Sequence, residues 1–183
     1  NATINANANV LGLGVYPAIV TFTNTVSGKT INRNVILYVN DFAAALDSPA
    51  LTFETSGVPW FSQTTTTHDG VDAAQSGVMG DSQTSSLQTT LTGPGKLTFW
   101  WKVSSETNWD FLRFYINGVE QSGSLVRISG EVNWVQKTVA IPTGSQTVKW
   151  SYTKDGSVNT GSDAAWVDQV VFTPTSASEI AVE

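Results

Sequence analysis

The chain alternates between hydrophobic and polar residues with a period of two, in short segments separated by clusters of Gly, Asn, Asp and Ser. Alternation of this kind is typical of β-strands with two different faces, and no convincing helical periodicity interrupts it. The pattern therefore predicts an all-β protein. The clearest predicted strands are residues 16–24, 32–39, 95–103, 110–117, 134–141, 146–153 and 164–172.

Two turns are predicted between neighbouring strands. Asn117 and Gly118 favour a tight hairpin, because both central positions of a type I′ turn need a positive φ. Residues 142–146, with the sequence PTGSQ, predict a second reversal of the chain.

The composition changes near residue 41, where strands rich in Asn, Val and Thr give way to DFAAALDSPALTF. We therefore predict a partial β segment at residues 1–40 and the main domain at residues 41–175. The first segment has too few strands for a sandwich of its own. The end of the chain, TPTSASEIAVE, joins a Pro/Ser/Thr stretch to a short apolar alternation, so we interpret residues 176–183 as a linker or the start of another module.

Composition and charge narrow the classes of partner. The 183 residues suffice for a substantial core, and only 13% of them are charged, about half of the usual fraction. A net charge of -6 leaves no basic surface for nucleic acid or anionic lipid. No apolar run approaches the length of a membrane span. The absence of cysteine excludes disulfides and thiolate metal sites.

The strand predicted at residues 164–172 carries a carboxylate among apolar residues. Strict alternation places Trp166, Asp168 and Val170 on one face, which we expect to be buried. An unpaired buried carboxylate is costly, so Asp168 must be protonated, paired with Lys or Arg, hydrogen-bonded to amides or bound to a cation. Among metal ions, oxygen ligands favour Ca²⁺.

The segment LTFETSGVPW, which contains Glu54, and the closing strand with Asp168 resemble the two ends of jelly-roll carbohydrate-binding modules. In those modules the first and last strands meet at a structural Ca²⁺, so the resemblance implies Glu54 and Asp168 as ligands. Apart from the resemblance, Asp69 and Asp72 in HDGVDAA have three interpretations: further ligands of this ion, with Asp72 as the predicted one, a separate site, or an ordinary solvated turn. Gln169 stands where the family often has a second Asp, and a metal-free, hydrogen-bonded carboxylate is the alternative. The matching residues are Phe53, Glu54, Gly57, Trp60, Ser76, Gly77, Leu87, Trp166 and Asp168.

Residues 46–173 also resemble the MAM and cleaved-adhesin group of extracellular jelly rolls. The stretches that carry this resemblance are THDGVDAAQSG, GPGKLTFWWKVSSE, DFLRFYINGVEQ and YTKDGSVNTGSDAAWVDQVVF. Residues 20–39 resemble the last strands of the Ig-like, BACON-type repeats of bacterial secreted proteins. Together these resemblances imply a jelly-roll β-sandwich, preceded by an Ig-like fragment, in an extracellular protein.

No motif indicates an active site. The single histidine, His68, lies in a Thr-rich loop without a nearby serine motif, and we expect it to be a surface residue. The chain has no phosphate-binding Gly loop, dinucleotide fingerprint or HExxH helix. Six carboxylates lie in or beside turns, where such residues are common, so we expect no catalysis. They are Glu106, Asp110, Glu120, Glu131, Asp155 and Asp163.

Aromatic residues offer a binding surface in addition to a core. The chain has seven Trp, four Tyr and eight Phe, and most of them are expected to be buried. Alternation leaves Trp100 outside the core, and it leaves Phe111 on a second face with Arg113 and Tyr115. Two further Trp flank turns and would reach solvent or cap the core. The predicted ligand-binding residues are Trp100, Trp109, Arg113, Tyr115 and Trp134.

These observations predict a non-catalytic extracellular carbohydrate-binding module. It would anchor a larger secreted or surface protein to a polysaccharide and would contain a structural Ca²⁺. The alternative is a protein-binding adhesion domain, which would contact extracellular matrix or cell-surface protein, or a spacer. A fragment of a glycan-processing or proteolytic enzyme is a third alternative.

Overall fold

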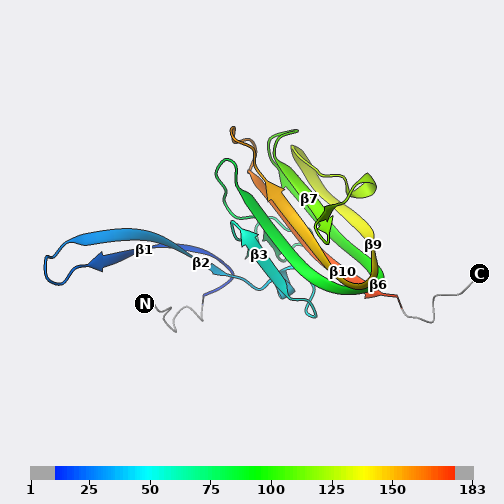
Figure 1. Ribbon diagram of the computed structural model, residues 1–183, viewed down its shortest axis with the longest axis horizontal. Helices are drawn as coiled ribbons and strands as arrows, with labels where there is room; N and C mark the ends of the chain where they lie inside the picture. Colours follow the sequence, from blue (N-terminus) through cyan, green and yellow to red (C-terminus); the bar gives the residue numbers. More distant parts are fainter. Residues whose placement is uncertain (1–10, 176–183) are drawn as a thin grey trace, which may run out of the picture.

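A computed structural model describes residues 11–175, which form a β-sandwich with a two-stranded hairpin extending from it (Figure 1). Two short helices occur in this range, α1 (Phe42–Ala45) and a 3₁₀ helix (Gly123–Leu125). Neither helix has the length and apolar character that crossing a membrane requires, in the part of the chain described. The strands are β1 (Gly14–Thr23), β2 (Thr30–Val39), β3 (Phe53–Gly57), β4 (Phe61–Gln63), β5 (Ala73–Gln75), β6 (Thr84–Ser104), β7 (Phe111–Ile116), β8 (Val119–Glu120), β9 (Glu131–Thr153) and β10 (Ala164–Pro174).

Two long strands, β6 and β9, pass through both layers of the sandwich. They have 21 and 23 residues and pair antiparallel along nearly their whole length. Both bend where Gly93 of β6 faces Gly144 of β9. A side chain at Gly93 would collide with the carbonyl oxygen of Pro142, so this close approach requires glycine. The reversal predicted at residues 142–146 is therefore wrong, because this segment is a bend inside β9.

The two halves of these strands organise two facing layers. One layer contains β3, the first half of β6, the second half of β9, β7 and β8. The other contains β4, β5, β10, the second half of β6 and the first half of β9. Phe99 of the second layer joins them, because its ring centroid lies 5.0 Å from that of Phe114 and 5.1 Å from that of Trp150. The predicted all-β sandwich is confirmed.

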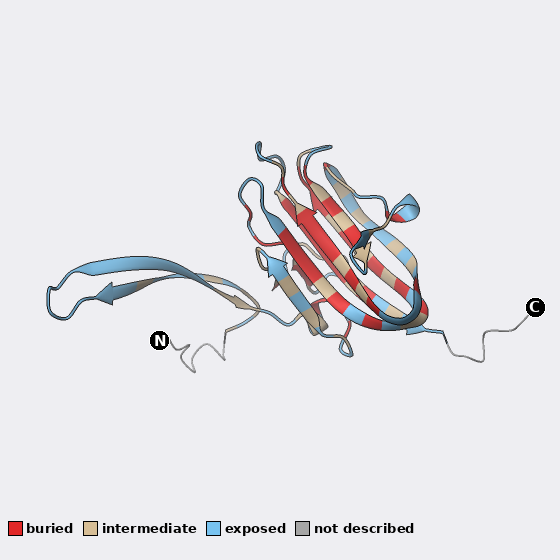
Figure 2. Cartoon of the chain, viewed as in Figure 1, coloured by how far each residue is buried: buried red, intermediate tan, exposed pale blue. Residues whose placement is uncertain are grey.

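Alternation along the strands fills the space between the layers. Buried residues alternate with less buried ones along β6, β7 and β9 (Figure 2). The predicted inward positions of β6 and β7 are confirmed, since their side chains belong to one hydrophobic core. These positions are Leu97, Phe99, Trp101, Val103, Leu112 and Phe114. The hairpin at Asn117 and Gly118 is also confirmed, because both residues have positive φ, 48° and 79°, and join β7 to β8.

The hairpin β1–β2 lies beside the sandwich and is mostly exposed (Figure 2). Its base is attached at the edge strand β4. The ring of Tyr38 lies 6.3 Å from that of Phe61, and the Asn40 side chain accepts a hydrogen bond from the backbone of Ser62 at 2.9 Å. Asp41 then caps α1 by accepting a bond from the backbone N–H of Ala44. The change of composition near residue 41 thus coincides with the junction between hairpin and sandwich.

Candidate functional site

A β-bulge in β10 places Asp168 outside the hydrophobic core. The pairing of β10 with β6 shifts between Asp168 and Val171, and Gln169 has a positive φ of 48° at this point. Val170 therefore returns to the core side, while Asp168 faces outward opposite Trp100. The expectation that Trp166, Asp168 and Val170 share one buried face is corrected by this extra residue.

Asp168 is nevertheless fully buried, because the loop between β4 and β5 covers it. The backbone N–H of His68 donates to Asp168 Oδ2 at 2.7 Å. Asp168 Oδ1 has no hydrogen-bond partner among the described residues. Burial raises the pKa of this carboxyl to about 6, although the backbone N–H of His68 opposes the shift.

Gln63, at the end of β4, holds the covering loop in place. Its side-chain oxygen accepts bonds from the backbone N–H groups of Thr65 and Thr66, both at 2.8 Å. Its side-chain nitrogen donates to the carbonyl oxygen of Thr66 at 2.8 Å. The loop that follows brings His68 and Asp69 over β10.

Two more carboxylates approach Asp168. One oxygen from each of Asp47, Asp69 and Asp168 lies within 4.8 Å of the others. Asp47 follows α1 in a left-handed conformation, with φ of 54°. Burial and the nearby charge of Asp69 raise the pKa of both Asp47 and Asp72. We call Asp47, Asp69, Asp72 and Asp168 the acidic cluster.

The acidic cluster is suited to a cation. Clustered carboxylates repel one another, and the open oxygen of Asp168 is shielded from water, so a bound Ca²⁺ would relieve both costs. Ca²⁺ takes six to eight oxygen ligands, and carboxylates are among the usual ones. The donor set and the unsatisfied buried oxygen fit this ion.

Glu54 does not belong to the acidic cluster. It lies on β3 opposite Gln88, whose side chain donates to it at 3.3 Å, whereas Asp168 lies opposite Trp100 in the other layer. β3 pairs with β6 and not with β10, so the first and last strands of the sandwich do not meet as the resemblance implied. The structure brings Asp47 and Asp69, in place of Glu54, to Asp168, and the charges of Asp69 and Asp47 act on Asp72.

The ring of His68 lies beside two of the predicted ligand-binding tryptophans. It stacks on Trp100 with 3.6 Å between ring centroids, and its centroid lies 6.0 Å from that of Trp134. His68 Nδ1 is 2.6 Å from the side-chain oxygen of Gln169. His68 is therefore partly buried rather than a free surface residue, and it covers the ring of Trp100.

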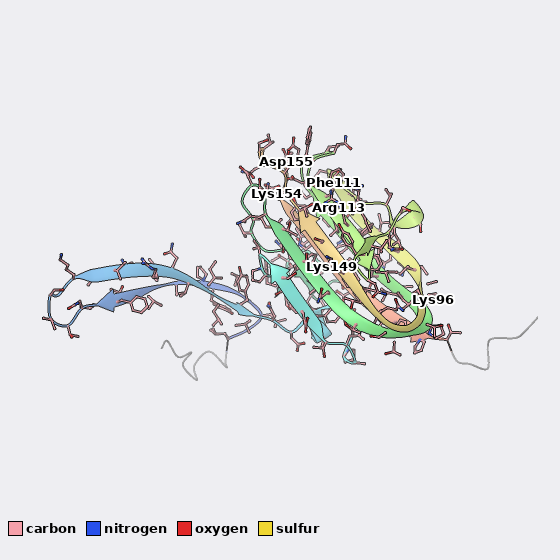
Figure 3. All side chains as sticks on the ribbon, viewed as in Figure 1. Lys96, Phe111, Arg113, Lys149, Lys154 and Asp155 are labelled. Atoms are coloured by element: carbon pink, nitrogen blue, oxygen red, sulfur yellow. The ribbon has the colours of Figure 1, made fainter. Side chains whose placement is uncertain are left out.

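Arg113 and Tyr115 lie on the outer side of the other layer, as alternation predicts. The guanidinium of Arg113 lies 4.7 Å from the ring of Phe111, and the ammonium of Lys149 lies 4.6 Å from the ring of Tyr115. The guanidinium of Arg127 lies 5.3 Å from the same Phe111 ring. We call Phe111, Arg113, Tyr115, Arg127 and Lys149 the β7 face, and Figure 3 labels three of its members along the sheet, Phe111, Arg113 and Lys149.

Small hydroxyl residues continue the β7 face across the sheet. Ser151 of β9 stands opposite Arg113, and its hydroxyl oxygen is 2.9 Å from that of Ser86 on β6. Thr153 receives a hydrogen bond from Arg113. Ser86 and Ser151 are buried, so this side of the sheet offers mainly aromatic rings and cations on regular strands.

Trp109 precedes β7 in a turn and is 60% exposed. Behind this turn, the ammonium of Lys154 is buried and pairs with Asp110 and Asp163. Asp110 also accepts a bond from the backbone N–H of Asp155 at 2.8 Å. These carboxylates tie together the loops at one end of the sandwich, where Figure 3 labels Lys154 and Asp155.

Comparison with known proteins supports the fold and identifies no family. No protein-family model and no curated protein matches the sequence. The chain is similar to the secreted serine protease VesC from Vibrio cholerae, with a TM-score of 0.55 and 18% identity, over 85% of this chain and 33% of the protease. The two share a β-sandwich fold. The chain spans about a third of the length of that protease, and identity this low carries nothing beyond the fold.

Two further solved structures are similar to the chain. The K1 cleaved adhesin domain of Lys-gingipain from Porphyromonas gingivalis has a TM-score of 0.48 at 18% identity, over 68% of this chain and 91% of that domain. The carbohydrate-binding module TmCBM61, solved with β-1,4-galactotriose, has a TM-score of 0.49 at 15% identity, over 73% and 94% of the two chains. Both groups to which the sequence shows a resemblance are thus represented among similar structures. The BACON-type resemblance of residues 20–39 stays a prediction.

Sequence reasoning missed Asp47 and the role of His68. Asp47 lies 121 residues before Asp168, and nothing in LDSPA distinguishes a ligand from an ordinary turn residue. The pairing of Lys149 with Tyr115 was detectable in part, because alternation in residues 146–153 places Lys149 outside the core. Its position opposite Tyr115 could not be predicted, because that position depends on the register between β7 and β9.

Proposed function

We propose that this chain is a non-catalytic module that binds a glycan through the β7 face and anchors a larger extracellular protein to a polysaccharide. The observation that carries the proposal is the row of Phe111, Arg113 and Tyr115 on the outer side of a regular sheet. Aromatic rings stack on the apolar faces of sugar rings, and cations and hydroxyls bind sugar oxygens. Because the side chains project from paired strands, little conformational entropy is lost when a ligand binds.

Trp100 and Trp134 are less suited to this role. His68 already occupies the ring face of Trp100 at stacking distance. Trp109 remains a candidate contact, since it is exposed and lies two residues before Phe111. The proposed ligand surface therefore retains Trp109, Arg113 and Tyr115 from the sequence prediction and adds Phe111 and Lys149.

Affinity electrophoresis against a panel of soluble polysaccharides, together with pull-down on insoluble ones, tests the proposal. The matched variants are Tyr115→Ala, which removes a ring from the β7 face, and Tyr16→Ala, which removes one from the β1–β2 hairpin. We expect binding of at least one polysaccharide to be lost in Tyr115→Ala and kept in Tyr16→Ala. Equal binding by both variants, with both folded, would refute the assignment of the surface.

We also propose that the acidic cluster binds a structural Ca²⁺. The ion would join the end of α1, the β4–β5 loop and β10, and it would offset the repulsion between their carboxylates. Ca²⁺ at 100 times its Kd would stabilise the fold by about 2.7 kcal/mol. We expect Ca²⁺ to raise the Tm and a chelator to reverse the rise.

Two variants separate this site from Glu54. In Asp168→Asn the effect of Ca²⁺ on the Tm should disappear, and in Glu54→Gln it should remain. Direct titration by calorimetry reports the stoichiometry. A wild-type Tm that does not respond to Ca²⁺, with no heat of binding, would remove the ion from the proposal and leave a protonated or hydrogen-bonded Asp168.

Protein adhesion is the second candidate function, and one observation favours it. The β1–β2 hairpin exposes several large apolar side chains, among them Ile19 (65%), Phe22 (52%) and Ile36 (54%). Exposed apolar surface of this kind often marks a protein interface. Retention on collagen or cell-surface protein, lost when residues 1–39 are removed, would support adhesion. Retention on no polysaccharide and no protein would favour a spacer.

A further inference from the structure

The β7 face is positively charged, although the protein as a whole is negatively charged. The chain has a net charge of -6 and only nine Lys and Arg. Three of these nine, Arg113, Arg127 and Lys149, lie against the rings of Phe111 and Tyr115. The nearest carboxylate is Glu120 of β8, which both arginines approach, at 3.7 Å and 3.0 Å. Glu54 lies further along the same side of the sheet, beyond Gln88, so three positive charges and two negative charges leave a local excess of one positive charge.

The aromatic rings hold the three cations in place, and ion pairs do not neutralise all of them. Glu120 lies between two guanidinium groups, so it cannot balance both of them. Lys149 makes no ion pair among the described residues, and its cross-strand partner on β6 is the neutral Gln88. Gln88 in turn donates to Glu54, so this amide separates Glu54 from Lys149. The ammonium over Tyr115 is therefore free to bind an anion.

We propose that the glycan bound by the β7 face is acidic, with carboxylate or sulfate groups that bind Lys149 and the two arginines. This inference rests on the proposed function and specifies its ligand class. Guanidinium groups bind carboxylate and sulfate oxygens with paired hydrogen bonds, and the ring of Phe111 holds both guanidinium groups in position. Ser86 and Ser151 are buried and bond each other behind this surface, and Thr153 holds Arg113 in place.

The negative charge of the rest of the protein restricts a polyanion to this positively charged surface. A polyanion is repelled by a chain with a net charge of -6, and it therefore binds only where the local potential is reversed. The alternative ligand is an acidic polypeptide. The glycan is favoured because the cations lie against two aromatic rings on a regular sheet.

The test compares a polyuronate, a sulfated glycan, a neutral galactan and polyglutamate by affinity electrophoresis and calorimetry. Lys149→Gln and Lys96→Gln form a matched pair. Each removes one positive charge from β9 or β6, but Lys96, labelled in Figure 3, lies in the half of β6 that belongs to the other layer, opposite Ala140 and Thr173. We expect Lys149→Gln to weaken binding of the acidic glycan about tenfold or more and Lys96→Gln to leave it within about twofold. Binding should also weaken with increasing salt.

The outcomes distinguish this inference from the proposed function. Binding of the neutral galactan with no binding of either acidic glycan would overturn the inference and leave glycan binding intact. Equal losses of affinity in Lys149→Gln and Lys96→Gln would show that only the net charge of the protein matters, and they would overturn the assignment of the site. Binding of polyglutamate as tightly as the acidic glycan would overturn the glycan ligand. Absence of binding to any of the four would overturn both proposals.

Discussion

The imidazole of His68 lies flat on the indole of Trp100, with ring centroids 3.6 Å apart and an angle of 17° between the planes. The same residue donates its backbone N–H to Asp168. One loop residue therefore covers a tryptophan and satisfies one oxygen of a buried carboxylate. This relationship fixes the β4–β5 loop on the outer side of the sandwich.

Replacement of His68 tests how strongly that loop is held. His68→Ala removes the ring but keeps the backbone N–H that bonds Asp168. A double-mutant cycle with Trp100→Leu should give a coupling energy of about 1 kcal/mol, since stacked rings contribute roughly that much beyond area burial. Unfolding in urea provides the free energies. Strict additivity of the two single changes would show that the rings do not interact in solution.

Asp168 should make the metal-free protein more stable in mild acid. Its folded-state pKa of about 6 lies above the unfolded value near 3.9. Between these values the folded state keeps a proton that the unfolded state has released. The free energy of unfolding therefore falls as pH rises through this window, by up to about 3 kcal/mol.

Urea unfolding in chelator from pH 4 to pH 7 measures this slope. Asp168→Asn cannot titrate, so the Asp168 contribution should be missing from its profile. The difference between the two profiles isolates this residue from all other titrating groups. Identical profiles would mean that the carboxylate is solvated or ion-paired in solution.

Loss of the Lys154 charge should destabilise one end of the sandwich. The side chain of Lys154 is fully buried and pairs with Asp110, which is also fully buried, and with Asp163. Lys154→Met leaves these carboxylates without a cation, which we expect to cost about 3–5 kcal/mol of unfolding free energy. Lys102→Met is the matched control, because Lys102 lies over the ring of Trp166 at 5.8 Å and makes no ion pair among the described residues. Equal effects of the two substitutions would contradict a structural role for the Lys154 pairs.

Removal of residues 1–39 should leave the sandwich folded. The hairpin β1–β2 pairs only with itself within the described chain, and an isolated two-stranded sheet contributes little stability. The truncated chain keeps Asn40 and Asp41, whose side chains bond the backbone of β4 and α1. Calorimetry should show one cooperative transition with a Tm within a few degrees of the full chain. Loss of that transition would mean that the predicted boundary near residue 41 divides a single domain.

Local alternation in the sequence was enough to predict the β class and the outward direction of Phe111, Arg113 and Tyr115. It was enough because each residue of a strand points opposite to its neighbours, whatever the strand pairs with. The turn at Asn117 and Gly118 was predictable for a similar reason, since positive φ is a property of single residues. Alternation failed at Gln169, where one extra residue moves Val170 to the other face.

The sequence by itself thus determined seven strand segments and the outward side chains of β7, and it marked Asp168 as a residue that needs a partner, but it did not predict β4, β5 or the first half of β6. The tertiary structure alone decided what surrounds it. His68 and Asp168 are separated by 100 residues, and Asp47 joins them only because α1 and the β4–β5 loop pack on the same part of β10. Glu54 is excluded because β3 pairs with β6. Contacts of this kind depend on strand register and loop closure, which no local pattern encodes.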